Sequence, residues 1–155
     1  MTIENNKFFL ELKIIRKDDD IFELQVTASN GRFRGMTEIY ETSESLEKFA
    51  NSLLGFPKQN LTLFHEIGIK DGYSYFSMKY YCIENSEYLG IEIALEENVV
   101  TSHRNEEKDK LKLEIFIERA AIDNFQKELI ELAKKQEGKA IIFGRNDSIF
   151  DGAAR

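Results

Sequence analysis

The feature that most limits the fold of this chain is a period-two alternation of apolar and polar residues near the N-terminus. It occurs in residues 8–16, in residues 22–28 and in residues 33–39. Successive side chains of a strand point to opposite faces, so each segment predicts a strand with one buried face. The apolar sets are Phe8, Leu10, Leu12 and Ile14; then Phe22, Leu24, Val26 and Ala28; then Phe33, Gly35, Thr37 and Ile39.

Short turns join these three strands. Residues 17–20 are polar, and Asn30-Gly31 suits a tight hairpin because both residues tolerate positive φ. Sequential strands with short connections predict an antiparallel meander. The side chains expected on the non-core face of the third strand are Arg32, Arg34, Met36, Glu38 and Tyr40.

The period then changes to that of a helix. Leu46, Phe49, Ala50, Leu53 and Leu54 follow helical spacing and predict one apolar stripe. At the start, Thr42 or Ser43 is suited to cap the helix, and Glu44 suits its positive end. At the end, Gly55 fits a left-handed position and Pro57 stops the helix.

The rest of the chain repeats these two patterns. Strands are expected over residues 60–67, 73–83, 88–95 and 111–117, with a turn at 84–86 and a polar loop at 99–109. A second amphipathic helix is marked by Ile122, Phe125, Leu129 and Leu132. We therefore expect a single α+β domain over residues 1–140, with a twisted antiparallel sheet of about six or seven strands and two helices packed on one face. Residues 141–155 are expected to form a C-terminal tail, with docking of residues 141–143 left open.

Two strand-to-helix units share their spacing. Residues 37–54 align without a gap on residues 113–130, so that Glu38 matches Glu114 and Phe49 matches Phe125. This indicates either an internal duplication or two amphipathic patterns that packing forces to look alike. The strands upstream do not match at the same offset.

Composition limits the compartment and the partners. The formal net charge is −7 and the pI is near 5.0, which disfavours nucleic acid and favours encounter with a basic partner. Cys82 is the one cysteine, so no intramolecular disulfide forms. The N-terminus lacks the pattern of a signal peptide, and no apolar run approaches the roughly 18 residues of a membrane span. The chain is expected to be cytoplasmic and not to bind membranes.

Motifs of catalysis and metal binding are absent from the sequence. His65 and His103 are the two histidines, and they lie far apart, whereas a metal site needs three or four converging ligands. Cys82 lies in an apolar strand, and no phosphate-binding loop or nucleophile elbow occurs. We expect no enzyme activity, no cofactor and no metal; an unrecognised site using His65 with Glu66 is the enzymatic alternative.

Tyrosine and arginine mark candidate binding surfaces. Tyr73, Tyr75 and Tyr81 share one side of their predicted strand, as Arg32, Arg34 and Tyr40 share one side of theirs. Tyr and Arg are favoured at the energetic centres of interfaces. The alternative is that a second layer or long aliphatic stems cover these side chains. The candidate partner-binding residues are Arg32, Arg34, Tyr40, Tyr73, Tyr75 and Tyr81.

The order of elements resembles that of a known family. The chain has a meander, then Phe33-x-Gly35 followed by Ile39-Tyr40, then a helix with Leu46, Phe49 and Leu53 that ends in Gly55-Phe56-Pro57, then further strands and a final helix. Over residues 8–135 this resembles small immunity proteins encoded beside bacterial polymorphic and contact-dependent toxins, especially the type that protects against a cell-wall-associated, tRNA-cleaving toxin. These are packing motifs, and no catalytic or binding residue comes with them. Arg32, Arg34 and the tail after Lys139 are not part of that pattern.

The resemblance implies a cytoplasmic protein that binds a cognate toxin domain and blocks it without chemistry of its own. Toxic nuclease domains tend to be basic, so the net charge of −7 would speed their capture. One alternative is a small-molecule-binding or regulatory domain, with a cavity between sheet and helices near Tyr75, Tyr81 and Cys82. Self-association through an exposed strand edge is also left open.

Overall fold

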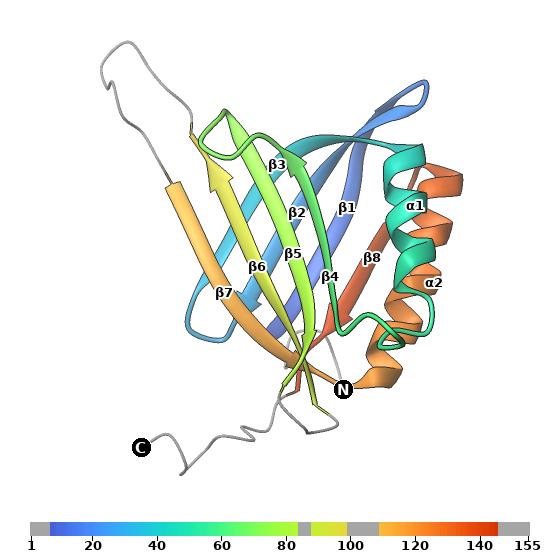
Figure 1. Ribbon diagram of the computed structural model, residues 1–155. Helices are drawn as coiled ribbons and strands as arrows, with labels where there is room; N and C mark the ends of the chain where they lie inside the picture. The colour runs from blue at the N-terminus through green and yellow to red at the C-terminus, as the bar shows by residue number, and fades with distance from the viewer. Residues whose placement is uncertain (1–6, 84–87, 99–108, 146–155) are drawn as a thin grey trace.

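The computed structural model describes residues 7–83, 88–98 and 109–145. These residues form eight strands and two helices, which confirms the α+β class (Figure 1). The elements are β1 (Phe8–Asp18), β2 (Ile21–Asn30), β3 (Arg34–Thr42), α1 (Ser43–Leu53), β4 (Thr62–Gly68), β5 (Ser74–Cys82), β6 (Leu89–Glu97), β7 (Asp109–Ile117), α2 (Arg119–Lys135) and β8 (Lys139–Phe143). The turn expected at 84–86 and residues 99–108 of the loop expected at 99–109 lie outside the described residues, whereas Asp109 begins β7.

The strands form two antiparallel four-stranded sheets. Sheet A has the order β3-β2-β1-β8 and sheet B has the order β4-β5-β6-β7. The expected meander of the first three strands is confirmed, but the expectation of one sheet with six or seven strands was wrong. Alternation reveals which face of a strand is buried and does not reveal which sheet it joins. Here α1 carries the chain from β3 to sheet B, and α2 carries it back from β7 to β8.

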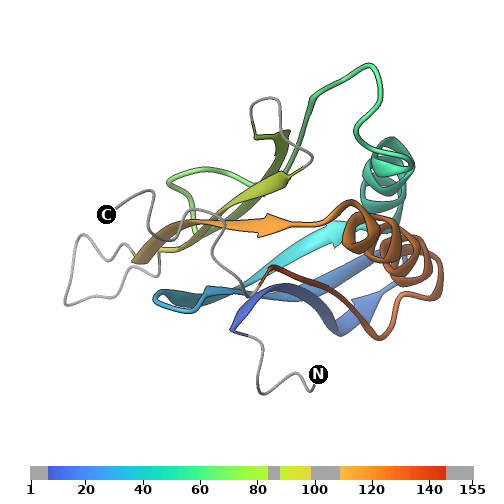
Figure 2. The same ribbon diagram turned by 90° about the horizontal axis from the view of Figure 1, so that it is seen from below.

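The two sheets face each other, and both helices lie along one side of the pair. Seen from below, the sheets diverge toward the side where α1 and α2 pack together (Figure 2). Helix α1 contacts β3 and β4, and α2 contacts β8. The helices therefore close the gap between two sheets, and the expectation that they cover one face of a single sheet is corrected.

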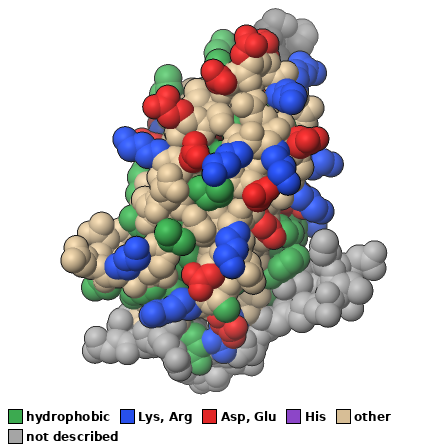
Figure 3. All heavy atoms as spheres, turned by 90° about the vertical axis from the view of Figure 1, so that its right-hand side faces the viewer, with side chains coloured by type: hydrophobic (Ala, Val, Ile, Leu, Met, Phe, Trp, Pro, Cys, Tyr) green, Lys and Arg blue, Asp and Glu red, His purple; other side chains and the backbone are tan. Residues whose placement is uncertain are grey.

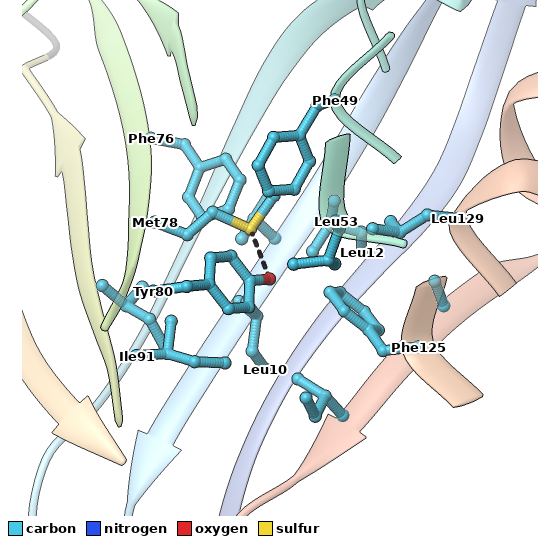
Figure 4. Packing of buried hydrophobic residues seen from close by; sticks show 14 of the residues in the cluster. Leu10, Leu12, Phe49, Leu53, Phe76, Met78, Tyr80, Ile91, Phe125 and Leu129 are labelled. Carbon is cyan, nitrogen blue, oxygen red and sulfur yellow. Dashed lines mark hydrogen bonds between the residues drawn. The ribbon is translucent and has the colours of Figure 1, made fainter. Parts of the chain in front are cut away.

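One hydrophobic core joins the sheets and the helices. Phe76, Met78 and Tyr80 of β5 point inward toward Phe49 of α1, as Figure 4 shows. Tyr80 is fully buried, its hydroxyl donates a hydrogen bond to the Met78 sulfur at 3.1 Å, and burial raises the pKa of that hydroxyl far above its usual range. From the other side, Phe125 of α2 completes the same core.

Strand β3 packs against sheet B. A Cβ atom at Gly35 would lie 2.6 Å from the Leu111 side chain of β7. Next along the inner face, the Thr37 hydroxyl donates a 3.0 Å hydrogen bond to the carbonyl of Glu96 in β6. Glycine at residue 35 thus leaves room for the Leu111 side chain, which would have to move if residue 35 were larger.

The ends of α1 are set by the residues that the sequence marks. Thr42 is the N-cap, and its side chain accepts a hydrogen bond from the Ser45 amide. Gly55 has φ +72, the left-handed conformation expected after the helix. Leu54 differs from the expectation, because it follows the last helical residue and is 56% exposed instead of joining the apolar stripe.

The C-terminal segment contributes a strand. Ile141 to Phe143, which the sequence assigned to the tail with docking left open, belong to β8 and pair with β1. The inner face of β8 carries Ala140 and Ile142, and both side chains are buried. The apolar run at this point thus completes sheet A. Residues 146–155 lie outside the described part of the chain.

The two strand-to-helix units have matching boundaries in the structure. Strand β3 leads directly into α1, as β7 leads into α2, and each four-stranded sheet is held by three antiparallel pairings. The helices meet where equivalent positions touch: the Gln126 side chain donates a hydrogen bond to the carbonyl of Ala50, 76 positions earlier. The shared spacing is therefore structural, and duplication remains the hypothesis that explains it.

Neither helix in the described residues is long and apolar enough to cross a membrane.

Gly68, at the end of β4, and Gly138, between α2 and β8, form a matched pair that tests the packing of the β4–β5 connection. Both have positive φ, but a Cβ at Gly68 would lie 2.5 Å from the Ser74 carbonyl oxygen, whereas a Cβ at Gly138 meets nothing within 4 Å. We expect Gly138→Ala to lower the free energy of unfolding by about 1–2 kcal/mol, from the left-handed backbone alone. Gly68→Ala should cost about 2–5 kcal/mol because the clash adds to that strain. Urea denaturation of both variants checks this, and equal losses would contradict the packing described.

Candidate protein-binding groove

A shallow groove lies on the outer face of sheet A, the face turned away from the core. Antiparallel pairing sets its side chains in rows across the strands. Arg34, Ser29 and Phe9 are opposite one another, and so are Met36, Thr27, Glu11 and Ile141. The groove has a volume of about 720 Å³ and is lined by Lys7, Phe9, Glu11, Gln25, Thr27, Ser29, Gly31, Arg32, Phe33, Arg34, Met36 and Ile141.

Phe33 is exposed because of the hairpin between β2 and β3. The Asn30 side-chain oxygen accepts hydrogen bonds from the amides of Arg32 and Phe33, at 3.1 and 2.9 Å. Gly31 adopts φ +87 in the same turn. The strand begins at Arg34, so Phe33 does not take the core-facing position that the alternation predicted, and its side chain is 60% exposed beside the groove.

The cations of the groove lack acidic partners within the described residues. Arg32 and Arg34 form no ion pair there, and the guanidinium of Arg34 lies 5.4 Å from the centre of the Phe9 ring. Glu11 is the acidic residue that lines the groove, and its carboxylate lies 3.7 Å from the Lys139 ammonium. The groove therefore combines exposed apolar side chains and positive charge around the polar Gln25, Thr27 and Ser29 of β2.

A second hollow adjoins the groove at the edge of sheet A. It has a volume of about 380 Å³ and lies between β3 and the ends of β6 and β7. Arg34 and Met36 line both hollows and so form the ridge between them. Met36 is 48% exposed on this ridge. The ridge presents one flexible apolar and one cationic side chain on edge strand β3.

The structure divides the six predicted binding residues between two sheets. Arg32 and Arg34 come together in the groove. Tyr40 is on the same outer face and is 58% exposed, but it is opposite Glu23 at the other end of β3 and does not line the groove. The three remaining tyrosines belong to sheet B or to the turn before β5.

Tyr73 and Tyr75 occupy different environments. Tyr73 precedes β5 and is 81% exposed. Tyr75 is on the outer face of sheet B but is buried, and its hydroxyl donates a 2.7 Å hydrogen bond to Glu66. Burial, followed by the Glu66 carboxylate, raises the pKa of this hydroxyl, so Tyr75 stays protonated and bound to Glu66 at neutral pH.

Tyr81 packs against the neighbouring strand. It is opposite Gly90 of β6, and a Cβ atom at that glycine would lie 2.8 Å from the Tyr81 ring. The ring therefore covers the backbone of Gly90, and a larger residue at that position would displace the ring. The hydroxyl of Tyr81 is buried and has no hydrogen-bond partner within the described part of the chain. Tyr75 and Tyr81 thus pack on sheet B itself and present little surface to a partner.

The sequence did not single out several residues of the groove. Lys7, Phe9 and Ile141 come from the two ends of the chain, and the pairing of β1 with β8 brings Phe9 and Ile141 onto one face. Phe9 had a local signal, because it alternates out of phase with Leu10 and Leu12. No local pattern places Ile141 beside Glu11, since their contact depends on a pairing between distant segments.

His65 forms a buried pair with an acid from another strand. Its Nε2 lies 2.9 Å from Oε2 of Glu41, and its ring stacks on Phe49 with a centroid distance of 4.7 Å. Glu41 also accepts a hydrogen bond from the Thr42 amide at the start of α1. Glu66 points to the other face and bonds Tyr75, so the pairing of His65 with Glu66 does not occur.

Two other kinds of site bear on binding: a metal-ligand cluster and the face that carries the helices. Among the described residues, no group of three or more His, Cys, Asp or Glu is placed to hold a metal ion. On the side that carries the helices, positive and negative side chains are interspersed (Figure 3). A surface of mixed sign supplies little directional attraction for a strongly charged partner.

The structure also corrects the expected cavity of the small-molecule alternative. The β5 residues that face the interior are Phe76, Met78, Tyr80 and Cys82; the first three are buried in the core, and Cys82 packs against it, partly buried. Tyr75 and Tyr81 face outward, away from the space between sheets and helices. These two tyrosines therefore do not line an interior site.

Comparisons with known proteins give no relative: no family model matches the chain, and neither curated proteins nor solved structures match it.

The buried pair of Glu41 and His65 is open to a stability test. His65→Phe keeps a ring against Phe49 but removes the nitrogen that faces Glu41, so we expect a loss of about 1–3 kcal/mol in the free energy of unfolding. Adding Glu41→Gln should recover part of that loss, because an amide costs less to bury unpaired than a carboxylate. Urea denaturation of both variants is the measurement. A neutral effect of His65→Phe would show that the pair does not stabilise the fold.

Proposed function

We propose that this protein is a non-enzymatic binding protein that captures a partner protein on the groove of sheet A. The observation that carries the proposal is the combination of exposed Phe33 and Met36 with two arginines that have no acidic partner in the described chain. Aromatic residues, Met and Arg are the types enriched at protein interfaces. The groove belongs to a rigid sheet backed by the core, so little order is lost when a partner docks there.

The role that fits this surface is that of an immunity protein. The resemblance in packing motifs implies a cognate toxin domain as the partner, bound in the cytoplasm and blocked by occupation of its surface. The net charge of −7 supports this proposal, because it attracts a basic domain over distance and raises the rate of encounter. The contacts of the groove would then hold the complex.

The proposal is tested by capture and by protection. The tagged protein is used at low salt to isolate partners from its native host, and a captured domain is expressed with and without it. We expect one basic toxin domain to be recovered, its complex to weaken as salt rises, and growth to be rescued by co-expression. Failure of any captured protein to inhibit growth, or failure of co-expression to rescue growth, would overturn the immunity role.

A pair of phenylalanine variants tests whether the groove is the surface used. Phe33 and Phe64 are 60% and 55% exposed; Phe33 precedes β3 of sheet A, and Phe64 belongs to β4 of sheet B. Replacing either with Asp changes the net charge equally. We expect Phe33→Asp to weaken the complex by about tenfold or more, because it places a charge at the interface. Phe64→Asp should leave the affinity within about twofold, as exposed sites outside an interface are near neutral. Calorimetric titration measures both, and the reverse order would move the interface to sheet B.

A further inference from the structure

The groove of sheet A carries an excess of positive charge within an acidic protein. Three cations, Lys7, Arg32 and Arg34, line it together with one carboxylate, Glu11. Lys139 already faces that carboxylate. Of the acids near the groove, Glu38 accepts a 3.4 Å hydrogen bond from Gln25 in the next row of the sheet. Glu97 and Asp109 line the adjoining hollow with Arg34, but neither forms an ion pair with it in the described chain. The guanidinium groups are thus left with hydrogen-bond donors that no acid of the described chain satisfies.

Apolar side chains lie beside Arg34, together with the hydroxyls of Ser29 and Thr27. Arg34 lies over the ring of Phe9, and Met36 and Ile141 share the neighbouring row. A guanidinium that stacks on a ring keeps the edge of its plane open to an acceptor. Beside apolar side chains, which exclude water, an ion pair gains strength, and the planar donors of arginine suit a carboxylate with two parallel hydrogen bonds.

We propose that the groove recognises a carboxylate that the partner presents between apolar side chains. This inference rests on the proposed function, and it adds the chemical group of the partner that the same surface would recognise. The exposed apolar side chains select a protein segment over a free anion, because an isolated anion would leave Phe33 and Met36 uncovered. The occupant is therefore an acidic and apolar segment of the partner.

Local and long-range electrostatics act in opposite directions here. The whole protein, at −7, attracts a basic partner, whereas the groove attracts an acid. The field of the whole protein decides how quickly the partner arrives, and the groove decides which part of the partner is held. This opposition makes the proposal testable. If the net charge decided binding, a basic peptide would bind more tightly than an acidic one. If the groove decides it, the acidic peptide binds more tightly.

The probe is a capped peptide, Gly-Ser-Phe-X-Leu-X-Ser-Gly, made with Glu, Gln or Lys at both X positions. Each peptide is titrated into the isotope-labelled full chain, and amide chemical shifts are recorded by NMR. We expect the Glu peptide to shift the amides of Arg34 and Met36 saturably and to bind about tenfold more tightly than the Gln peptide, with no saturable binding of the Lys peptide. Tighter binding of the Lys peptide, or equal binding of all three, would overturn the proposal.

Matched charge variants locate the effect. Arg34→Glu and Lys13→Glu change the net charge equally, and both side chains are exposed on the outer face of sheet A, but Lys13 does not line the groove. Arg34→Glu should abolish preference for the Glu peptide, and Lys13→Glu should retain it. Arg34→Met, which keeps an unbranched apolar stem over Phe9, should lose the preference as well. Retention of the preference in both Arg34 variants would count against the inference.

The two proposals fail in different ways. A toxin domain that binds at Phe33 while the peptides show no preference for Glu would leave the immunity role intact and overturn the carboxylate. A clear preference for the Glu peptide in a protein that rescues no growth would support recognition of a carboxylate and overturn the immunity role.

Discussion

The structure depends on the close approach of β3 to sheet B. Gly35 leaves room for Leu111, and Thr37 bonds the backbone of β6, so one face of β3 is fixed against the opposing sheet. Because strand side chains alternate, this contact forces Arg34 and Met36 to the outside. The groove is thus formed on the other side of the strand that packs against sheet B. A change at Gly35 would disturb the core and the groove together.

The outer faces of the two sheets differ in which side chains remain exposed. On sheet B, Tyr75 is held by Glu66 and Tyr81 covers Gly90, so the aromatic groups there complete the packing of the sheet itself. On sheet A, Phe33 and Met36 remain exposed beside arginines that no acid of the described chain neutralises. Exposed apolar side chains beside such cations are typical of surfaces that bind proteins. The charge of −7 acts over distance on top of this local pattern.

Local patterns in the sequence predicted the elements better than their assembly. The strands near the N-terminus, both amphipathic helices and the cap at Thr42 follow from spacing and from backbone preferences that act within a few residues. Assignment of strands to two sheets, and the pairing of β8 with β1, depend on contacts between distant segments and leave no periodic trace. Of the candidate site, Arg32 and Arg34 were predicted to share a surface, and they do. Phe33 was placed in the core, because the alternation was extended into a turn where it no longer holds.

The most direct test of the account is to map the surface that a captured toxin domain covers. Amide chemical shifts of the labelled protein, recorded with and without the unlabelled domain, distinguish the two sheets in one experiment. The account predicts that the largest changes fall on residues 31–36 and on Phe9 and Ile141, with residues 62–68 and 74–82 nearly unchanged. Changes concentrated on β4 and β5, with the groove unaffected, would contradict it.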